Sequence, residues 1–106
     1  MTTFGLSPEV LQRIVYVLSC NEKIRCVKIF GSRALGRERV GSDIDLALDA
    51  TGLNWDDMLS LRVKLEELML PYRFDLVNIQ ELAESDPLHE HIDRVGKTIF
   101  IRNAAS

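Results

Sequence analysis

The sequence predicts an α/β (α+β) fold in which helices flank a small mixed β-sheet. An apolar run, Val27–Phe30, and an alternating run, Asp43–Leu48, have the patterns of strands and lie on either side of a long loop. Three amphipathic stretches with helix start signals accompany them. Because 106 residues can bury one modest core, we expect a single domain over residues 1–106.

The N-terminal third of the chain is predicted to form a helix and then a strand. Ser7 is a typical N-cap, and Pro8 stands at the first helical position. Apolar residues then recur at helical spacing until about Cys20. A strand is expected over residues 24–30.

The middle of the chain predicts a strand, a helix and another strand. The second strand covers residues 43–49, and Asn54 is the N-cap of a helix that ends before Pro71. A third strand is expected over residues 73–79. The apolar stripe of this helix consists of Met58, Leu61, Leu65 and Leu68.

The C-terminal part predicts one more helix and a short edge strand. Ser85 or Asp86 caps a helix that begins at Pro87 and stops at Gly96. The edge strand covers residues 98–101.

The strand directions follow from the connections between them. Strands one and two should be antiparallel. Gly31 and Ser32 follow the first strand and Asp43 begins the second, and we expect these residues to contact the same ligand. The helix between strands two and three favours a parallel pair. Asp75 would then lie about 4.8 Å across from the second strand.

Paired carboxylates are the first sign of chemistry. Asp43 and Asp45 are two residues apart, so their side chains point to one side of the sheet. Hard oxygen ligands without nearby Cys or His favour Mg²⁺ or Mn²⁺ over Zn²⁺. Because Mg²⁺ usually keeps substrate phosphate in its shell, the pair predicts a phosphate-bearing ligand.

The loop before these carboxylates suits the same ligand. Gly31 lets backbone N–H groups approach an anion, and Ser32 adds a hydroxyl at the start of a single helical turn. Arg33 is a candidate for phosphate binding. Arg37 and Arg39 fit solvated loop charges equally well.

These residues resemble a known signature. Gly31-Ser32, ten residues, and then Asp43-Ile44-Asp45 is similar to the Gly-Ser-x10-Asp-x-Asp pattern of the DNA polymerase beta-like nucleotidyltransferase superfamily. The short chain looks like its minimal nucleotidyltransferases of the MntA type, which are antitoxin partners of HEPN-domain toxins. Asp75 stands where that family has a third carboxylate.

The resemblance implies a polymerase beta palm-like core and a transfer reaction. Asp43, Asp45 and Asp75 would be catalytic and would bind Mg²⁺, two ions in all, with Mn²⁺ as an alternative. Gly31 and Ser32 would hold the triphosphate of ATP, together with Arg33. The acceptor would be a tyrosine hydroxyl of a HEPN toxin, so the expected activity is protein AMPylation.

Two alternatives stay open. The chain could transfer a nucleotide to a small molecule or an RNA end, with a separate subunit or a second copy completing the acceptor site. It could instead be an antitoxin that neutralises its partner by binding alone. Three carboxylates that repel one another without a metal count against the second alternative.

Composition limits the other classes of function. The net charge of −3 argues against binding to duplex nucleic acid. No apolar stretch reaches the ~20 residues of a membrane span, and the start lacks the basic residues of a signal peptide, so a cytoplasmic location is expected. Cys20 and Cys26 are expected to be reduced packing residues.

Three further residues have a simpler interpretation. His89 and His91 point in different directions on a helix, so we expect them on its solvated surface. Trp55, at a helix start, is expected to be a core or staple residue.

Overall fold

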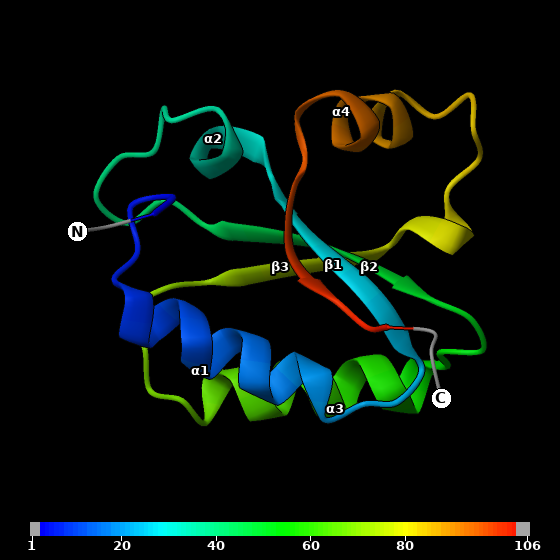
Figure 1. Ribbon diagram of the computed structural model, residues 1–106, viewed down its shortest axis with the longest axis horizontal. Coiled ribbons are helices and arrows are strands. Elements are labelled where there is room, and N and C mark those ends of the chain that lie inside the picture. Colours follow the sequence, from blue (N-terminus) through cyan, green and yellow to red (C-terminus); the bar gives the residue numbers. More distant parts are fainter. Residues whose placement is uncertain (1–2, 104–106) are drawn as a thin grey trace.

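Residues 3–103, the part of the chain that the computed structural model describes, form helices on both sides of one sheet (Figure 1). In chain order the elements are α1 (Pro8–Ser19), β1 (Ile24–Phe30), α2 (Gly31–Ala34), β2 (Ile44–Ala50), α3 (Trp55–Glu66), β3 (Phe74–Asn78), the 3₁₀-helix η1 (Ile79–Glu81), α4 (Pro87–Val95) and β4 (Lys97–Ile101).

The sheet is mixed, as predicted. Its strand order is β3-β2-β1-β4, with β1 antiparallel to β2 and to β4. The pair β2 and β3 is parallel, because α3 carries the chain back between them. The predicted strand directions are therefore confirmed, and the strand ends differ from the prediction by at most one residue.

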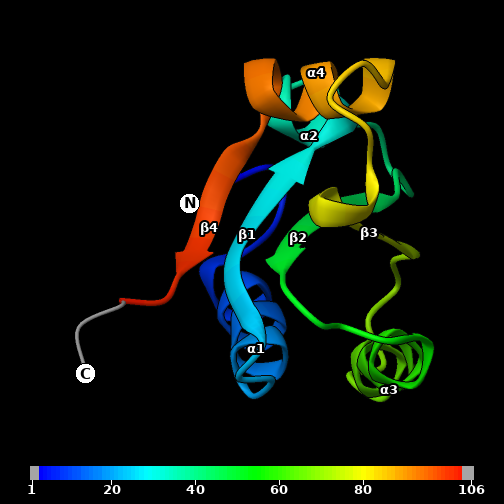
Figure 2. The ribbon, with the colours of Figure 1, turned by 90° about the vertical axis from the view of Figure 1, so that its right-hand side faces the viewer.

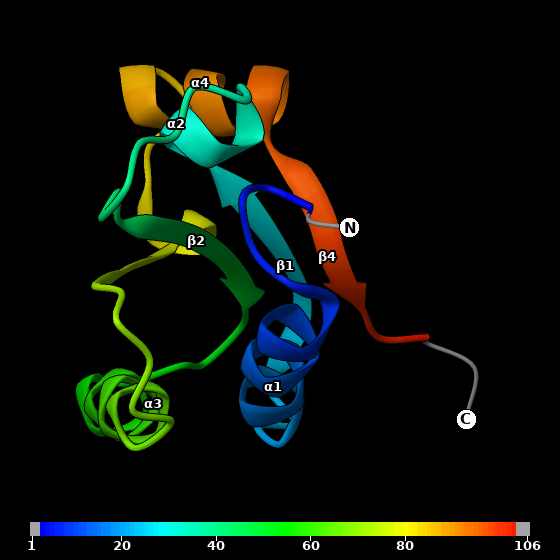
Figure 3. The ribbon, with the colours of Figure 1, turned by 90° about the vertical axis from the view of Figure 1, so that its left-hand side faces the viewer.

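The main core lies between the sheet and the pair α1 and α3, which cover one face (Figures 1 and 3). Ile14 of α1 and Leu65 of α3 are completely buried there. The opposite face is covered at one end by α4, with α2 beside it (Figure 2). Phe30, Ala47 and Ile92 form a smaller apolar cluster under α4.

The helix starts follow the predicted caps. The Ser7 hydroxyl accepts the Val10 N–H at 3.2 Å, and Asp86 accepts the Leu88 N–H at 2.9 Å. At α3, Asn54 and Asp57 accept each other's backbone N–H groups in a capping box. These short polar side chains satisfy N–H groups that have no partner inside the helix.

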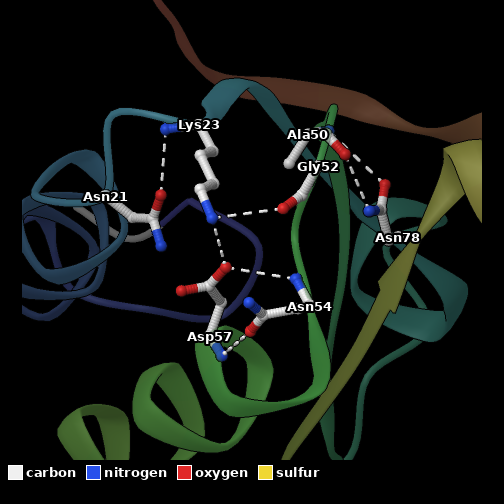
Figure 4. A network of polar contacts seen from close by, with 7 residues as sticks. All are labelled: Asn21, Lys23, Ala50, Gly52, Asn54, Asp57 and Asn78. Carbon is white, nitrogen blue, oxygen red and sulfur yellow. Dashed lines mark hydrogen bonds and ion pairs between the residues drawn. The ribbon is translucent and has the colours of Figure 1, made fainter.

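Two polar side chains, Lys23 and Asn78, connect parts of the chain that are far apart in the sequence (Figure 4). Lys23, just before β1, donates to the Asp57 carboxylate at 2.7 Å and to the Gly52 carbonyl at 3.1 Å. The buried Asn78 side chain donates to the Ala50 carbonyl at 2.8 Å. The amide of Asn78 therefore joins the ends of β2 and β3.

Two packing predictions are wrong. Trp55 is 80% exposed, because the apolar residue that fills the core at this corner is Leu53, just before α3. Cys20 is exposed at the end of α1, whereas Cys26 is half-buried, and no disulfide joins the two. No helix within residues 3–103 has the length and apolar character needed to cross a membrane.

Candidate functional site

The predicted carboxylates lie at one end of the neighbouring strands β2 and β3. Asp45 of β2 and Asp75 of β3 are direct partners in the parallel ladder, so their side chains share a face of the sheet. Asp43 is exposed and precedes β2 by one residue, although it was predicted to begin the strand. Asp45 is half-buried, and Asp75 is exposed.

The environment of Asp45 is short of positive charge. Burial raises the pKa of this carboxyl above its ordinary value, and the Asp75 and Asp43 carboxylates raise it further. The Arg33 guanidinium opposes the shift but does not cancel it. A cation placed among these carboxylates would therefore be bound favourably.

Gly31 brings the backbone directly against this carboxylate. It has φ +72°, a conformation that side chains rarely adopt, and a Cβ atom added to it would overlap the Asp45 Oδ2 atom. The position therefore requires glycine for two separate reasons. The start of the loop lies in contact with the acidic end of β2.

The single helical turn predicted after Gly31 is present as α2. Ser32 is half-buried, and within the described part of the chain neither its N–H nor its hydroxyl has a hydrogen-bond partner. These two donors come directly after Gly31, which lies against the Asp45 carboxylate. Arg37 and Arg39 are exposed, as solvated loop charges would be.

Arg33 is buried, and its guanidinium is already hydrogen-bonded. Its side chain is 3% exposed and stacks on Tyr72, with the guanidinium carbon 4.9 Å from the ring centre. Its nitrogens donate to three backbone carbonyls, those of Phe4 at 2.9 Å, Ser42 at 2.8 Å and Asp43 at 3.3 Å. Because these bonds occupy the guanidinium, the geometry favours a role in holding the loop over the predicted contact with the nucleotide.

His91 belongs to the site, contrary to the prediction of a solvated surface position. It is half-buried, and its Nε2 accepts the Gly31 N–H at 3.2 Å. Its ring also packs edge-on against Phe30, with centroids 6.0 Å apart. No sequence signal links α4 to Gly31 across 60 residues, so this contact comes from the tertiary fold alone. His89 instead pairs with Asp93 at 3.2 Å.

The chemistry of the three carboxylates suits a hard metal ion. Within residues 3–103, no group of three or more His, Cys, Asp or Glu side chains is already drawn together around one point. The donors are nevertheless all carboxylate oxygens, and Asp45 is destabilised in its charged form by its burial and by two like charges. Hard divalent cations such as Mg²⁺ match this donor set.

Comparison with known proteins assigns the family. The model of the polymerase beta nucleotidyltransferase family matches residues 12–105, and the chain therefore belongs to this family. No curated protein sequence matches the chain significantly.

Solved structures agree with this assignment. A structure described as a candidate minimal nucleotidyltransferase is 32% identical, with 88% of this chain and 96% of the other covered and a TM-score of 0.65. A toxin–antitoxin crystal structure with AMP-PNP is 25% identical over 88% of this chain and 74% of the other, with a TM-score of 0.73.

A third similar structure supports the assignment of the fold only. It is a tri-AMPylated Shewanella oneidensis HEPN toxin in complex with the MNT antitoxin, 22% identical over 89% of this chain and 71% of the other, with a TM-score of 0.67. These similarities support the predicted nucleotidyltransferase fold.

Proposed function

We propose that this chain is a Mg²⁺-dependent nucleotidyltransferase that transfers AMP from ATP to a hydroxyl group of a partner protein. The observation that carries the proposal is the contact of Gly31 with Asp45, beside Asp75 on the next strand. This contact joins the two halves of the Gly-Ser-x10-Asp-x-Asp signature in space.

Asp43, Asp45 and Asp75 would hold the metal. Bound Mg²⁺ supplies charge neutralisation of the triphosphate and lowers the pKa of an attacking hydroxyl. The half-buried Asp45 would be the central ligand, because both other carboxylates act on its charge. The exposed Asp75 is accessible from solvent, where an acceptor must enter.

Ser32 would bind the phosphates. Its N–H and hydroxyl, which have no partner among residues 3–103, can donate to the β- and γ-phosphate oxygens, and the same bonds would stabilise the leaving pyrophosphate. In the reaction, the acceptor oxygen forms a bond to the α-phosphorus while the bond from that phosphorus to the pyrophosphate oxygen breaks. The Asp75 carboxylate would accept the proton of the acceptor hydroxyl.

We propose a tyrosine of a HEPN toxin as the acceptor, which would make the chain an antitoxin. The toxin–antitoxin structure that contains AMP-PNP supports a nucleotide site and a toxin partner for this fold. The toxin in the 22% identical complex is tri-AMPylated, and this modification suggests the class of acceptor.

Intact-mass spectrometry tests this proposal. The protein encoded by the gene next to this one would be tested as the partner, in an incubation with this chain, Mg²⁺ and ATP. Additions of ~329 Da, the mass of one AMP group, are expected on the partner and should disappear when the metal is removed with EDTA.

Two variants serve as controls. The double variant Asp43→Asn/Asp45→Asn should give no addition. Asp49→Asn, on the same strand but hydrogen-bonded to Gln80, should leave the addition unchanged. A stable complex without any addition would overturn AMP transfer to a protein and would favour neutralisation by binding alone.

A further inference from the structure

His91 holds the first residue of the turn that carries Ser32. Its Nε2 accepts the Gly31 N–H at 3.2 Å, so the proton of the neutral ring resides on Nδ1. Gly31 has an unusual backbone conformation, with φ +72°, and its carbonyl accepts the Leu35 N–H at 3.2 Å. Both polar backbone groups of Gly31 are therefore hydrogen-bonded.

The imidazole itself is fixed by packing. It meets Phe30 edge-on at 6.0 Å, and the next residue in the chain, Ile92, is 1% exposed in the cluster with Phe30 and Ala47. A ring held on a packed helix is a rigid acceptor. It differs in this respect from His89, which pairs with the exposed Asp93 on the same helix.

The donors of this turn fall into two groups, one bonded to His91 and one available to a ligand. The Gly31 N–H is already bonded to His91, whereas the Ser32 N–H and hydroxyl have no partner within residues 3–103. A phosphate can therefore bind at Ser32 without displacing the imidazole. The direction of the Ser32 donors depends on the preceding peptide, which His91 holds.

We propose that His91 is a positioning residue of the phosphate-binding turn. Its Nε2 fixes the Gly31 peptide and so orients the Ser32 N–H and hydroxyl toward the β- and γ-phosphates. This inference rests on the proposed function, because it assigns His91 a task in binding the triphosphate. His91 contacts neither the nucleotide nor the metal in this arrangement.

Two substitutions separate the acceptor from the ring. His91→Phe keeps the aromatic contact with Phe30 but removes the acceptor, while His91→Gln restores an acceptor oxygen without the ring. His89→Phe and His89→Gln are matched controls two residues away on α4. Calorimetric titrations with AMP-PNP and with AMP, both with Mg²⁺, distinguish the phosphate clamp from the rest of the site.

The expected result is selective for the triphosphate analogue. His91→Phe should weaken AMP-PNP binding by about 3- to 10-fold, the effect of one hydrogen bond, and leave AMP binding unchanged. His91→Gln should recover most of the loss, and both His89 variants should bind as the wild type does. The Gly31 amide should exchange with solvent faster in His91→Phe than in the wild type, as measured by NMR.

Several results would overturn the inference. Unchanged or tighter AMP-PNP binding by His91→Phe would show that His91 is idle or competes with phosphate. Equal losses for AMP and AMP-PNP would indicate general structural damage. Unchanged Gly31 amide exchange in His91→Phe would remove the hydrogen bond on which the inference depends.

Failure of the proposed function has a different signature. The wild-type chain would bind neither nucleotide, which would overturn the nucleotide site and the phosphate-orienting role of His91 together. The Gly31 amide exchange would still decide whether His91 fixes this peptide.

Discussion

Asp45 and Asp75 lie directly opposite each other on the parallel strands β2 and β3, with their side chains on one face of the sheet. Strands in a sheet are about 4.8 Å apart, so the two carboxylates are held as close neighbours by the backbone register. The register is unbroken from Ile44 opposite Phe74 to Leu48 opposite Asn78. The fold therefore enforces a repulsion that a bound cation would relieve.

The first prediction is that Asp45→Asn stabilises the protein in the absence of metal. The raised pKa of Asp45 means that the folded state holds this proton more tightly than the unfolded state does. Stability is therefore lost as pH rises from the ordinary value of 3.8 through the raised pKa, and the loss persists at neutral pH. In EDTA at pH 7, Tm should rise on the order of 3 °C in Asp45→Asn and converge with wild type below pH 3.8.

Mg²⁺ should reverse the order of the two Tm values, so that the wild type becomes more stable than Asp45→Asn. The ion should raise the Tm of the wild type and leave that of Asp45→Asn unchanged, since only the wild type has the central ligand. Asp49→Asn, on the same strand, is the control and should respond to Mg²⁺ as the wild type does. A lower Tm for Asp45→Asn in EDTA would contradict the repulsion.

The second prediction concerns the positive φ of Gly31 and its contact with the Asp45 carboxylate. Gly31→Ala should lower the free energy of unfolding by about 3 kcal/mol, because alanine is strained at positive φ and its Cβ meets the Asp45 carboxylate. Gly36→Ala is the matched control, since Gly36 has φ +71° with no atom within 4 Å of its added Cβ. It should lose only about 1 kcal/mol, the conformational part.

Urea denaturation of both variants measures the difference. Equal losses of unfolding free energy would mean that the Asp45 carboxylate moves aside freely. The contact between Gly31 and Asp45 would then add nothing to the cost of the substitution. The larger loss in Gly31→Ala should be accompanied by loss of AMP-PNP binding, whereas Gly36→Ala should still bind.

The fold could be predicted from local patterns because its elements have strong local signals. Ser7 and Asn54 are side-chain caps, and the alternation after Asp43 marks a strand with one polar side. The parallel pairing followed from the helix between the two strands. The opposition of Asp45 and Asp75 then required only that these strands be neighbours.

The rest of the site depends on contacts that no local pattern encodes. Arg33 is a charged residue in a basic loop, yet it is buried because carbonyls of three separate residues and the Tyr72 ring surround it. His91 reaches Gly31 only because α4 packs over the end of β1 through Ile92. The role of the carboxylates in binding a metal stays a prediction.

The third prediction is that Arg33→Lys strongly destabilises the loop. A lysine ammonium cannot donate to three carbonyls in the planar arrangement of a guanidinium and stack on Tyr72 at the same time. The expected loss is about 2–4 kcal/mol in the free energy of unfolding, measured by urea denaturation. Arg37→Lys, at an exposed position of the same loop, should lose less than about 0.5 kcal/mol.

The outcome also tests the alternative role of Arg33. A variant that keeps wild-type stability but loses AMP-PNP binding would restore Arg33 as a phosphate ligand. A variant with lower stability whose folded form still binds AMP-PNP would identify Arg33 as the residue that holds the loop.

The fourth prediction concerns the ion pair at the start of α3. The hydrogen bond from Lys23, followed by that from the Asn54 backbone, lowers the pKa of the Asp57 carboxyl. A lowered pKa contributes stability above the ordinary value of 3.8, and this contribution is lost as pH falls through the lowered pKa. Asp57→Asn should therefore lower Tm at pH 7 on the order of 2–4 °C, and the difference from wild type should close below pH 3.8.

Asp56→Asn separates this ion pair from a general effect of charge at the helix start. Asp56 lies in the same first turn, but Lys23 bonds to Asp57 and has no contact with Asp56 among the ion pairs of residues 3–103. Thermal unfolding of both variants should be compared at low and high salt, since salt screens exposed pairs. Equal effects of the two substitutions at every pH would assign the stabilisation to the helix dipole instead of Lys23, because both carboxylates face the same N-terminus.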